Sequence, residues 1–155
     1  MCRNNMMKKT IIRAIGILLI ILGTFKAYTC LRVVAVYVPI AFEHGLAALG
    51  ASAVLLNLIM AIIGMAKVAG GLGLLWLKQW AKWTAAAATI LHAIILICFG
   101  IPIWIQMANG TFQNTAGIPL WKDYVTIAVN TVIAVTLLAY MKNENAQQGG
   151  GEVRS

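Results

Sequence analysis

The chain has 155 residues, of which 61% are hydrophobic and 10% are charged, and its formal net charge is +8. A soluble domain would carry about 25% charged residues, so this composition excludes an ordinary soluble protein and indicates an integral membrane protein. The basic residues flank apolar stretches and form no phosphate-reading patch, which excludes nucleic acid as a partner.

Residues 1–10 are a short basic segment, and residues 11–31 form the first stretch long enough to span a bilayer of about 30 Å. A signal peptide is the alternative for this stretch, because basic residues precede its apolar run. We favour a retained span, since Lys26 interrupts the approach to any cleavage site. Translation starts at Met1 or Met7, because the sequence from Met7 is also typical of a bacterial N-terminus.

After the first span, Pro39 is expected to end or kink the helix, because proline donates no backbone hydrogen bond. Residues 40–49 are then a candidate for a short helix at the membrane interface. Residues 51–77 and 80–106 form the second and third spans, and the very short turn between them predicts antiparallel neighbours.

The turn between the second and third spans is rich in tryptophan and lysine. Tryptophan prefers the headgroup level of a membrane, where its ring and its N–H are both satisfied, and lysine reaches lipid phosphates there. The turn is therefore expected at a membrane surface, and the residues that mark it are Trp76, Trp80, Trp83, Lys78 and Lys82. Small residues just upstream are expected to let a neighbouring helix approach closely: Ala66, Gly70 and Gly73.

Residues 124–141 form the fourth span, and the polar, glycine-rich tail 143–155 is expected to be disordered. The membrane domain therefore covers residues 11–142. With four spans, both termini and the tryptophan-rich turn share the side that holds most of the basic residues, which is the cytoplasm by the positive-inside rule. The expected fold is an all-α, four-helix transmembrane bundle in the bacterial inner membrane, with both termini cytoplasmic.

Several polar residues lie within the expected spans, where a charge is expensive to bury. Lys67 lies about 15 Å from the turn at the usual rise per residue, which places it near the midplane of the bilayer. Helical periodicity places Lys67 on an inward face of the span. The residues that share this face are Met60, Ile63, Gly64, Gly71 and Leu74. Gly64 and Gly71 are expected to leave space beside the amine. A buried lysine is either neutral or paired, and its nearest polar neighbour is expected among Glu43, His92 and Asn130.

Two interpretations of these residues stay open. In the first, a polar cluster in the bundle binds a small molecule or relays protons, and its members come from Lys67, His92, Asn130, Glu43 and Lys26. In the second, they only form hydrogen bonds between helices, each worth on the order of 0.6 kcal/mol. No spacing motif supports a metal site, a cofactor or a catalytic residue, so enzymatic activity is not expected.

Glycine-rich motifs in the first three spans resemble those of the DoxX-like group of small four-helix bacterial membrane proteins. The first span reads Arg13-x-x-Gly16 and then Gly23-Thr24-Phe25-Lys26, and the second reads Gly70-Gly71-Leu72-Gly73-Leu74-Leu75 before the basic turn. The resemblance covers residues 13–105 and implies an accessory subunit associated with quinone-linked or thiol redox systems. Lys67 departs from the pattern, because DoxX-like proteins often carry an acid in this span.

The sequence thus favours a small polytopic protein that acts as an accessory or structural membrane subunit. Its expected partners are the lipid bilayer and either a second copy of the chain or another membrane protein. The alternative is a membrane-embedded site, centred on Lys67, for a quinone-like or redox-linked molecule or for proton relay. Replacement of Lys67 by leucine separates the two: the accessory protein tolerates it, whereas the ligand site loses binding.

Overall fold

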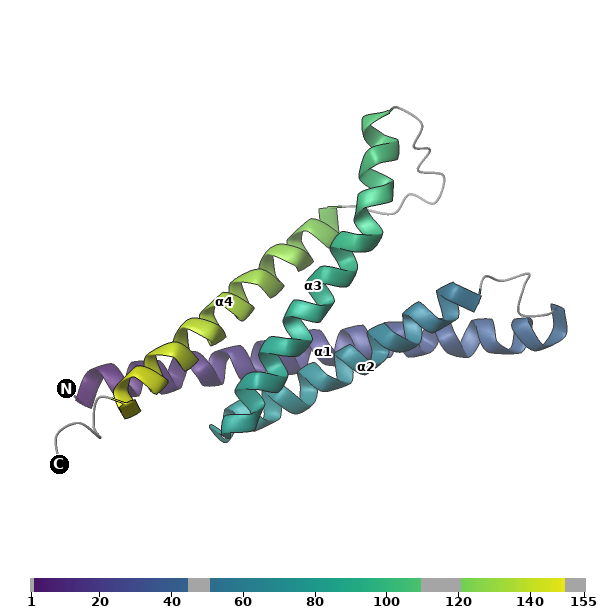
Figure 1. Ribbon diagram of the computed structural model, residues 1–155. Coiled ribbons are helices and arrows are strands. Elements are labelled where there is room, and N and C mark those ends of the chain that lie inside the picture. Colours follow the sequence, from purple (N-terminus) through teal and green to yellow (C-terminus); the bar gives the residue numbers. More distant parts are fainter. Residues whose placement is uncertain (1, 45–50, 110–120, 150–155) are drawn as a thin grey trace. The chain divides into compact units, whose positions relative to one another are not determined.

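The computed structural model describes residues 2–44, 51–109 and 121–149, and within these ranges the chain forms four helices and no strand (Figure 1). The helices are α1 (Cys2–His44), α2 (Ala51–Leu75), α3 (Gln79–Ala108) and α4 (Trp121–Gly149). The prediction of an all-α fold with four long helices is confirmed.

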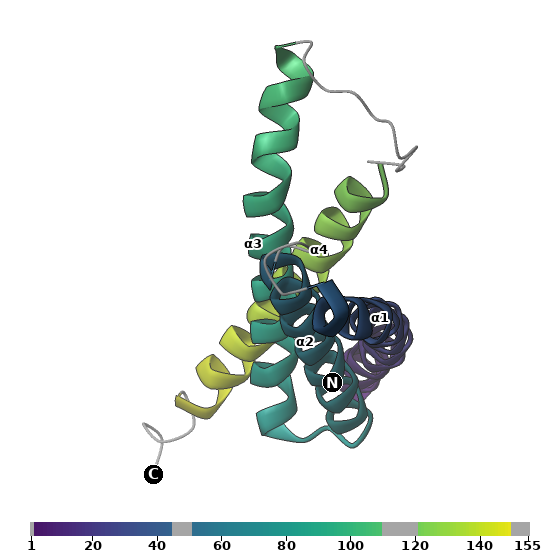
Figure 2. The ribbon, with the colours of Figure 1, turned by 90° about the vertical axis from the view of Figure 1, so that its right-hand side faces the viewer.

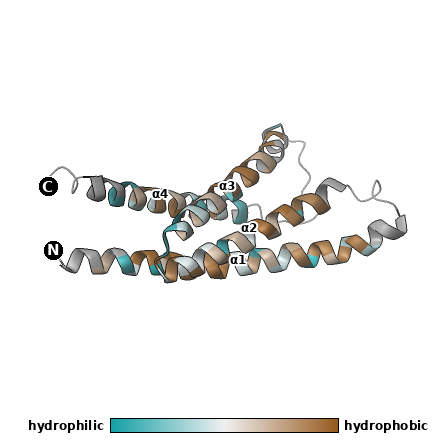
Figure 3. Cartoon of the chain, turned by 60° about the horizontal axis from the view of Figure 1, so that its bottom comes forward, coloured by the Kyte–Doolittle hydropathy of each residue, from teal (hydrophilic) through white to brown (hydrophobic). Residues whose placement is uncertain are grey.

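Each helix contains one stretch that is able, by its length and composition, to cross a membrane. These stretches are Lys9–Pro39, Val54–Leu75, Gln79–Phe99 and Lys122–Glu144. Hydrophobic residues run along much of every helix in Figure 3. A helix suits such sequences because it satisfies all of its interior backbone polar groups without water.

Threonine hydroxyls inside the helices are satisfied locally. Thr29, Thr126 and Thr136, for example, each donate to the carbonyl oxygen four residues earlier, at 2.9, 2.7 and 2.7 Å. This bond hides the hydroxyl from an apolar environment without a partner from another helix. These three threonines therefore need no hydrogen-bond partner on another helix.

The chain divides into two compact units, residues 1–88 and 89–155. The first unit holds α1, α2 and the first turns of α3, and the second unit holds the rest of α3 and α4. Within the first unit, α1 and α2 pack together as an antiparallel hairpin in which α2 lies beside part of the longer α1 (Figure 1). Figure 2 shows the two helices next to each other, seen nearly end-on.

Helix α1 continues through Pro39 to His44, where the sequence predicted an end or a kink. Proline removes only its own N–H bond, and an apolar segment gains by keeping its other backbone groups paired within the helix. Residues 40–44 of the expected interfacial helix are thus the last turn of α1, and residues 45–50 lie outside the described ranges.

Helix α4 extends to Gly149, so residues 143–149 of the tail that was predicted to be disordered are helical. The segment contains glutamate, alanine and glutamine, which are good helix formers. Adding residues to an existing helix also avoids the unfavourable nucleation step. The remaining tail residues, 150–155, lie outside the described ranges.

The turn between α2 and α3 closes with a Schellman motif. The N–H of Lys78 donates to the carbonyl oxygen of Gly73 at 2.9 Å, and the N–H of Leu77 donates to that of Leu74 at 3.0 Å. Leu77 takes the left-handed conformation that this motif requires, with φ of 56°. Glycine usually occupies that position, so α2 ends at Leu75 with a strained leucine in its place.

Candidate functional site

The hairpin of α1 and α2 is closest at two pairs of glycines. A Cβ atom added to Gly16 would lie 2.8 Å from the carbonyl oxygen of Gly71, and one added to Gly71 would lie 2.6 Å from that of Gly16. At the second pair, a Cβ on Gly23 would lie 2.6 Å from the carbonyl oxygen of Gly64, and one on Gly64 would lie 2.9 Å from that of Gly23. Only glycine permits such backbone contact between helices.

Lys67 lies between the two glycines of α2, on the face that meets α1. Its side chain is only 1% exposed. A Cβ on Gly23 would lie 3.0 Å from the Cβ of Lys67, so the lysine leaves α2 directly beside the backbone of α1. The other residues that periodicity placed on this inward face are also buried: Met60, Ile63, Gly64, Gly71 and Leu74.

The space that the sequence predicted beside Lys67 is occupied. Backbone atoms of α1 fill the positions next to Gly64 and Gly71, with the nitrogen of Ala27 2.8 Å from a Cβ on Gly64. The two glycines therefore let the helices approach each other, and they do not line a cavity beside the amine.

Lys26 brings a second positive charge to the same place. It follows Gly23 by three residues, so both lie on one face of α1. Side chains lean toward the N-terminus of their own helix. In this antiparallel hairpin, Lys26 therefore leans back toward Gly23 and Lys67 leans back toward Gly64, which is the partner of Gly23. The charge of Lys26 acts on Lys67.

His92 and Asn130 form a pair within the second unit, between α3 and α4. Nδ2 of Asn130 lies 3.4 Å from Nδ1 of His92 and donates to the carbonyl oxygen of Thr126 at 2.7 Å. His92 is 3% exposed and Asn130 is 1% exposed. The amide nitrogen can donate to Nδ1 of His92 in the tautomer that carries the ring proton on Nε2.

The structure thus brings together Lys26 with Lys67 in the first unit and His92 with Asn130 in the second. The side chain of Glu43 lies outside the described residues. Within the described ranges, no group of three or more histidine, cysteine, aspartate or glutamate residues is arranged to hold a metal ion.

The small residues predicted to pack against a neighbouring helix lie against the start of α3. A Cβ on Gly70 would lie 3.0 Å from the nitrogen of Ala85, and one on Gly73 would lie 2.5 Å from the Cβ of Ala81. Ala66 is half-buried. Gly70 and Gly73 hold α2 and the first turns of α3 together, so they serve packing and not ligand binding.

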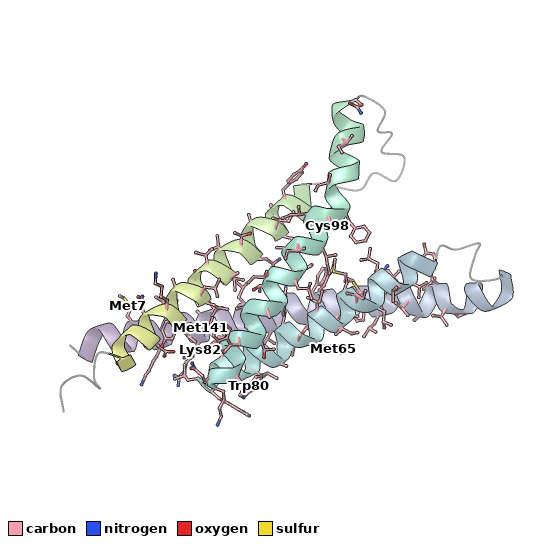
Figure 4. All side chains as sticks on the ribbon, in the orientation of Figure 1. Met7, Met65, Trp80, Lys82, Cys98 and Met141 are labelled. Atoms are coloured by element: carbon pink, nitrogen blue, oxygen red, sulfur yellow. The ribbon has the colours of Figure 1, made fainter. Side chains whose placement is uncertain are left out.

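The two lysines of the tryptophan-rich turn, Lys78 and Lys82, differ in exposure. Trp76, Trp80 and Lys78 are exposed. Lys82 instead is 4% exposed, and its Nζ donates to Oε1 of Gln79 at 2.9 Å. Figure 4 shows Trp80 and Lys82 together at this end of α3. Lys78, and not Lys82, is thus the lysine of the turn that reaches outward.

No protein-family model matches the chain, and no curated protein or solved structure matches it either.

Proposed function

We propose that the chain is a small multi-pass protein of the bacterial inner membrane that serves as an accessory or structural subunit. One observation carries this proposal: each of the four apolar stretches buries half or less of its residues within the chain. The remaining residues face outward and suit contact with lipid or with a partner subunit, because bilayer and protein surfaces are both apolar there. The DoxX-like resemblance supports the same role and adds quinone-linked or thiol redox systems as its setting.

The charge distribution supports an orientation with both termini in the cytoplasm. Four spans place both termini and the α2–α3 turn on one side, and this side holds most of the lysines and arginines. The exposed tryptophans of the turn are consistent with a position at the headgroup level.

A second candidate function is a membrane-embedded ligand or proton-relay site centred on Lys67. The observation that favours it is the buried position of Lys67 on the face of α2 that meets α1, where the charge of Lys26 acts on it. A lysine near the centre of a membrane helix costs about 2.5–3.5 kcal/mol on insertion scales. A protein that gains nothing from such a residue has no reason to keep it.

Thermal unfolding of Lys67→Met in detergent, measured by circular dichroism, tests whether the accessory subunit tolerates the loss of this lysine. An accessory subunit is expected to tolerate the change and to unfold at a higher temperature, because methionine fills a similar volume without a charge. The exposed Lys78→Met is the matched control and should leave the midpoint unchanged. A Lys67→Met protein that unfolds at a lower temperature than Lys78→Met would contradict the expectation that the protein tolerates this change, and would show that Lys67 stabilises the fold.

A further inference from the structure

We propose that the end of the α1–α2 hairpin beside the tryptophan-rich turn binds the headgroups of anionic phospholipids, such as phosphatidylglycerol. The cations of this surface are Lys9, Arg13 and Lys78, which together are called the basic rim. This inference rests on the membrane location proposed above and adds the class of lipid that the protein prefers. It is carried by three exposed cations that share one end of the hairpin with exposed tryptophans.

The basic rim lies where α1 runs past the end of α2 (Figure 1). A Cβ on Gly16 would lie 3.2 Å from the Cβ of Leu74, so Gly16 is about level with the last turn of α2. Arg13 and Lys9 precede Gly16 by three and seven residues, which places them about 4.5 Å and 10.5 Å farther along the helix. Lys78 closes the Schellman motif about one turn, or about 5 Å, beyond the same level. The three cations therefore lie at similar depths.

Within the first compact unit, residues 1–88, the basic rim has no acidic neighbour. Glu43 is the single acidic residue of this unit, and about 45 Å of α1 separates it from Arg13. Lys9, Arg13 and Lys78 are all exposed, so an anion from outside the chain can reach them. At the surface of a membrane, the nearest anions are the headgroups of anionic lipids, which attract lysine and arginine close to the surface.

The tryptophans of the turn favour a lipid over an acidic protein as the source of this anion. Trp76, Trp80 and Trp83 are all exposed. An indole at the headgroup level keeps its ring in the apolar region, while its N–H donates to a polar group of the lipid. The indoles suit any phospholipid, whereas the cations favour one with a net negative charge over zwitterionic phosphatidylcholine.

Quenching of tryptophan fluorescence by brominated lipids tests the proposal on the full chain in phosphatidylcholine vesicles. A background with Trp104→Phe and Trp121→Phe retains only the three tryptophans of the turn. Brominated phosphatidylglycerol is expected to associate with these tryptophans about tenfold or more better than brominated phosphatidylcholine. High salt should reduce this preference, because it screens exposed charges.

Variants of the basic rim should remove the preference. Lys9→Gln, Arg13→Gln and Lys78→Gln should each lower it by up to about fivefold, and the triple variant should abolish it. Arg13→Lys keeps the charge and should keep the preference. Arg32→Gln is the matched control, because Arg32 is an exposed arginine of α1 that lies about 28 Å from Arg13 along the helix. This control should behave like the background.

Equal quenching by the two lipids would overturn the anionic preference and leave the membrane location intact, because each lipid has to reach the indoles to quench them. The same preference in the triple variant and in Arg32→Gln, with both folded by circular dichroism, would also overturn it. Displacement of brominated phosphatidylglycerol by soluble glycerol phosphate would reject a lipid as the source of the phosphate. Quenching by neither lipid would refute the position of the turn at the membrane, and with it the proposed function.

Discussion

Replacing Gly71 with alanine is expected to destabilise the protein, although alanine is normally the better helix former by about 1 kcal/mol. The new Cβ would lie 2.6 Å from the carbonyl oxygen of Gly16. This oxygen belongs to the backbone of α1 and cannot rotate away as a side-chain atom can. The helices of the hairpin therefore have to separate locally to admit one methyl group.

The size of the effect follows from that distance. An ordinary contact between such atoms is about 3.5 Å, so the 2.6 Å separation requires α1 and α2 to part by up to about 0.9 Å. Overpacking of this kind costs about 1–3 kcal/mol. Subtracting the gain of about 1 kcal/mol in helix propensity leaves a net cost of about 0–2 kcal/mol. We expect the upper half of that range, about 1–2 kcal/mol, because the contacting atom belongs to the backbone and cannot move aside alone.

Unfolding in mixed micelles, followed by far-ultraviolet circular dichroism, measures this change. Gly16→Ala should behave like Gly71→Ala, and the double variant should lose less than the sum of the two, because both methyl groups open the same contact. Ala69→Val adds bulk at an exposed position of α2 and is the control, with no loss expected. A Gly71→Ala protein as stable as the wild type would refute the backbone contact between α1 and α2.

Three further variants test other parts of the structure by the same unfolding measurement. Leu77→Gly should raise the free energy of unfolding by about 1 kcal/mol, because glycine adopts a φ of 56° without strain; a decrease would argue against the Schellman turn. Gly70→Leu should destabilise more than Leu74→Ala, since even a Cβ at Gly70 lies 3.0 Å from the nitrogen of Ala85; equal tolerance would mean that this face looks outward. Asn130→Ala should cost on the order of 0.6 kcal/mol, and this loss should shrink when His92 is already alanine; an unchanged loss would show that the two residues do not interact.

The helices could be predicted from the sequence because each apolar run is long enough to span a bilayer. The ends of the helices were predicted less well from the residues at those positions. Proline lowers helix propensity at its own position, yet α1 continues through Pro39 to His44. Polar composition indicated disorder after residue 142, yet α4 extends the helix to Gly149. Both differences arise because a helix that already exists is easier to continue than to start.

The inward face of Lys67 could be predicted from helical periodicity, and its approach to Gly23 of α1 could not. That approach depends on the register of α1 against α2, which no single span specifies. The signal in the sequence is the equal spacing of the glycines, which lie seven residues apart at Gly16 and Gly23 and again at Gly64 and Gly71. The same glycines explain why a space predicted beside the amine is filled by the backbone of α1.

Cysteine labelling in intact cells tests most directly the central claim that the chain crosses the bacterial inner membrane four times, with both termini cytoplasmic. The native cysteines, Cys2, Cys30 and Cys98, are first replaced by serine, and one new cysteine is introduced at a time. A membrane-impermeant maleimide is expected to label Asn114→Cys from outside and to label Ser155→Cys only after permeabilisation. Labelling of Ser155→Cys in intact cells, with Asn114→Cys protected, would contradict the orientation. Labelling of both from outside would contradict a single crossing of the membrane by α4, which lies between the two positions.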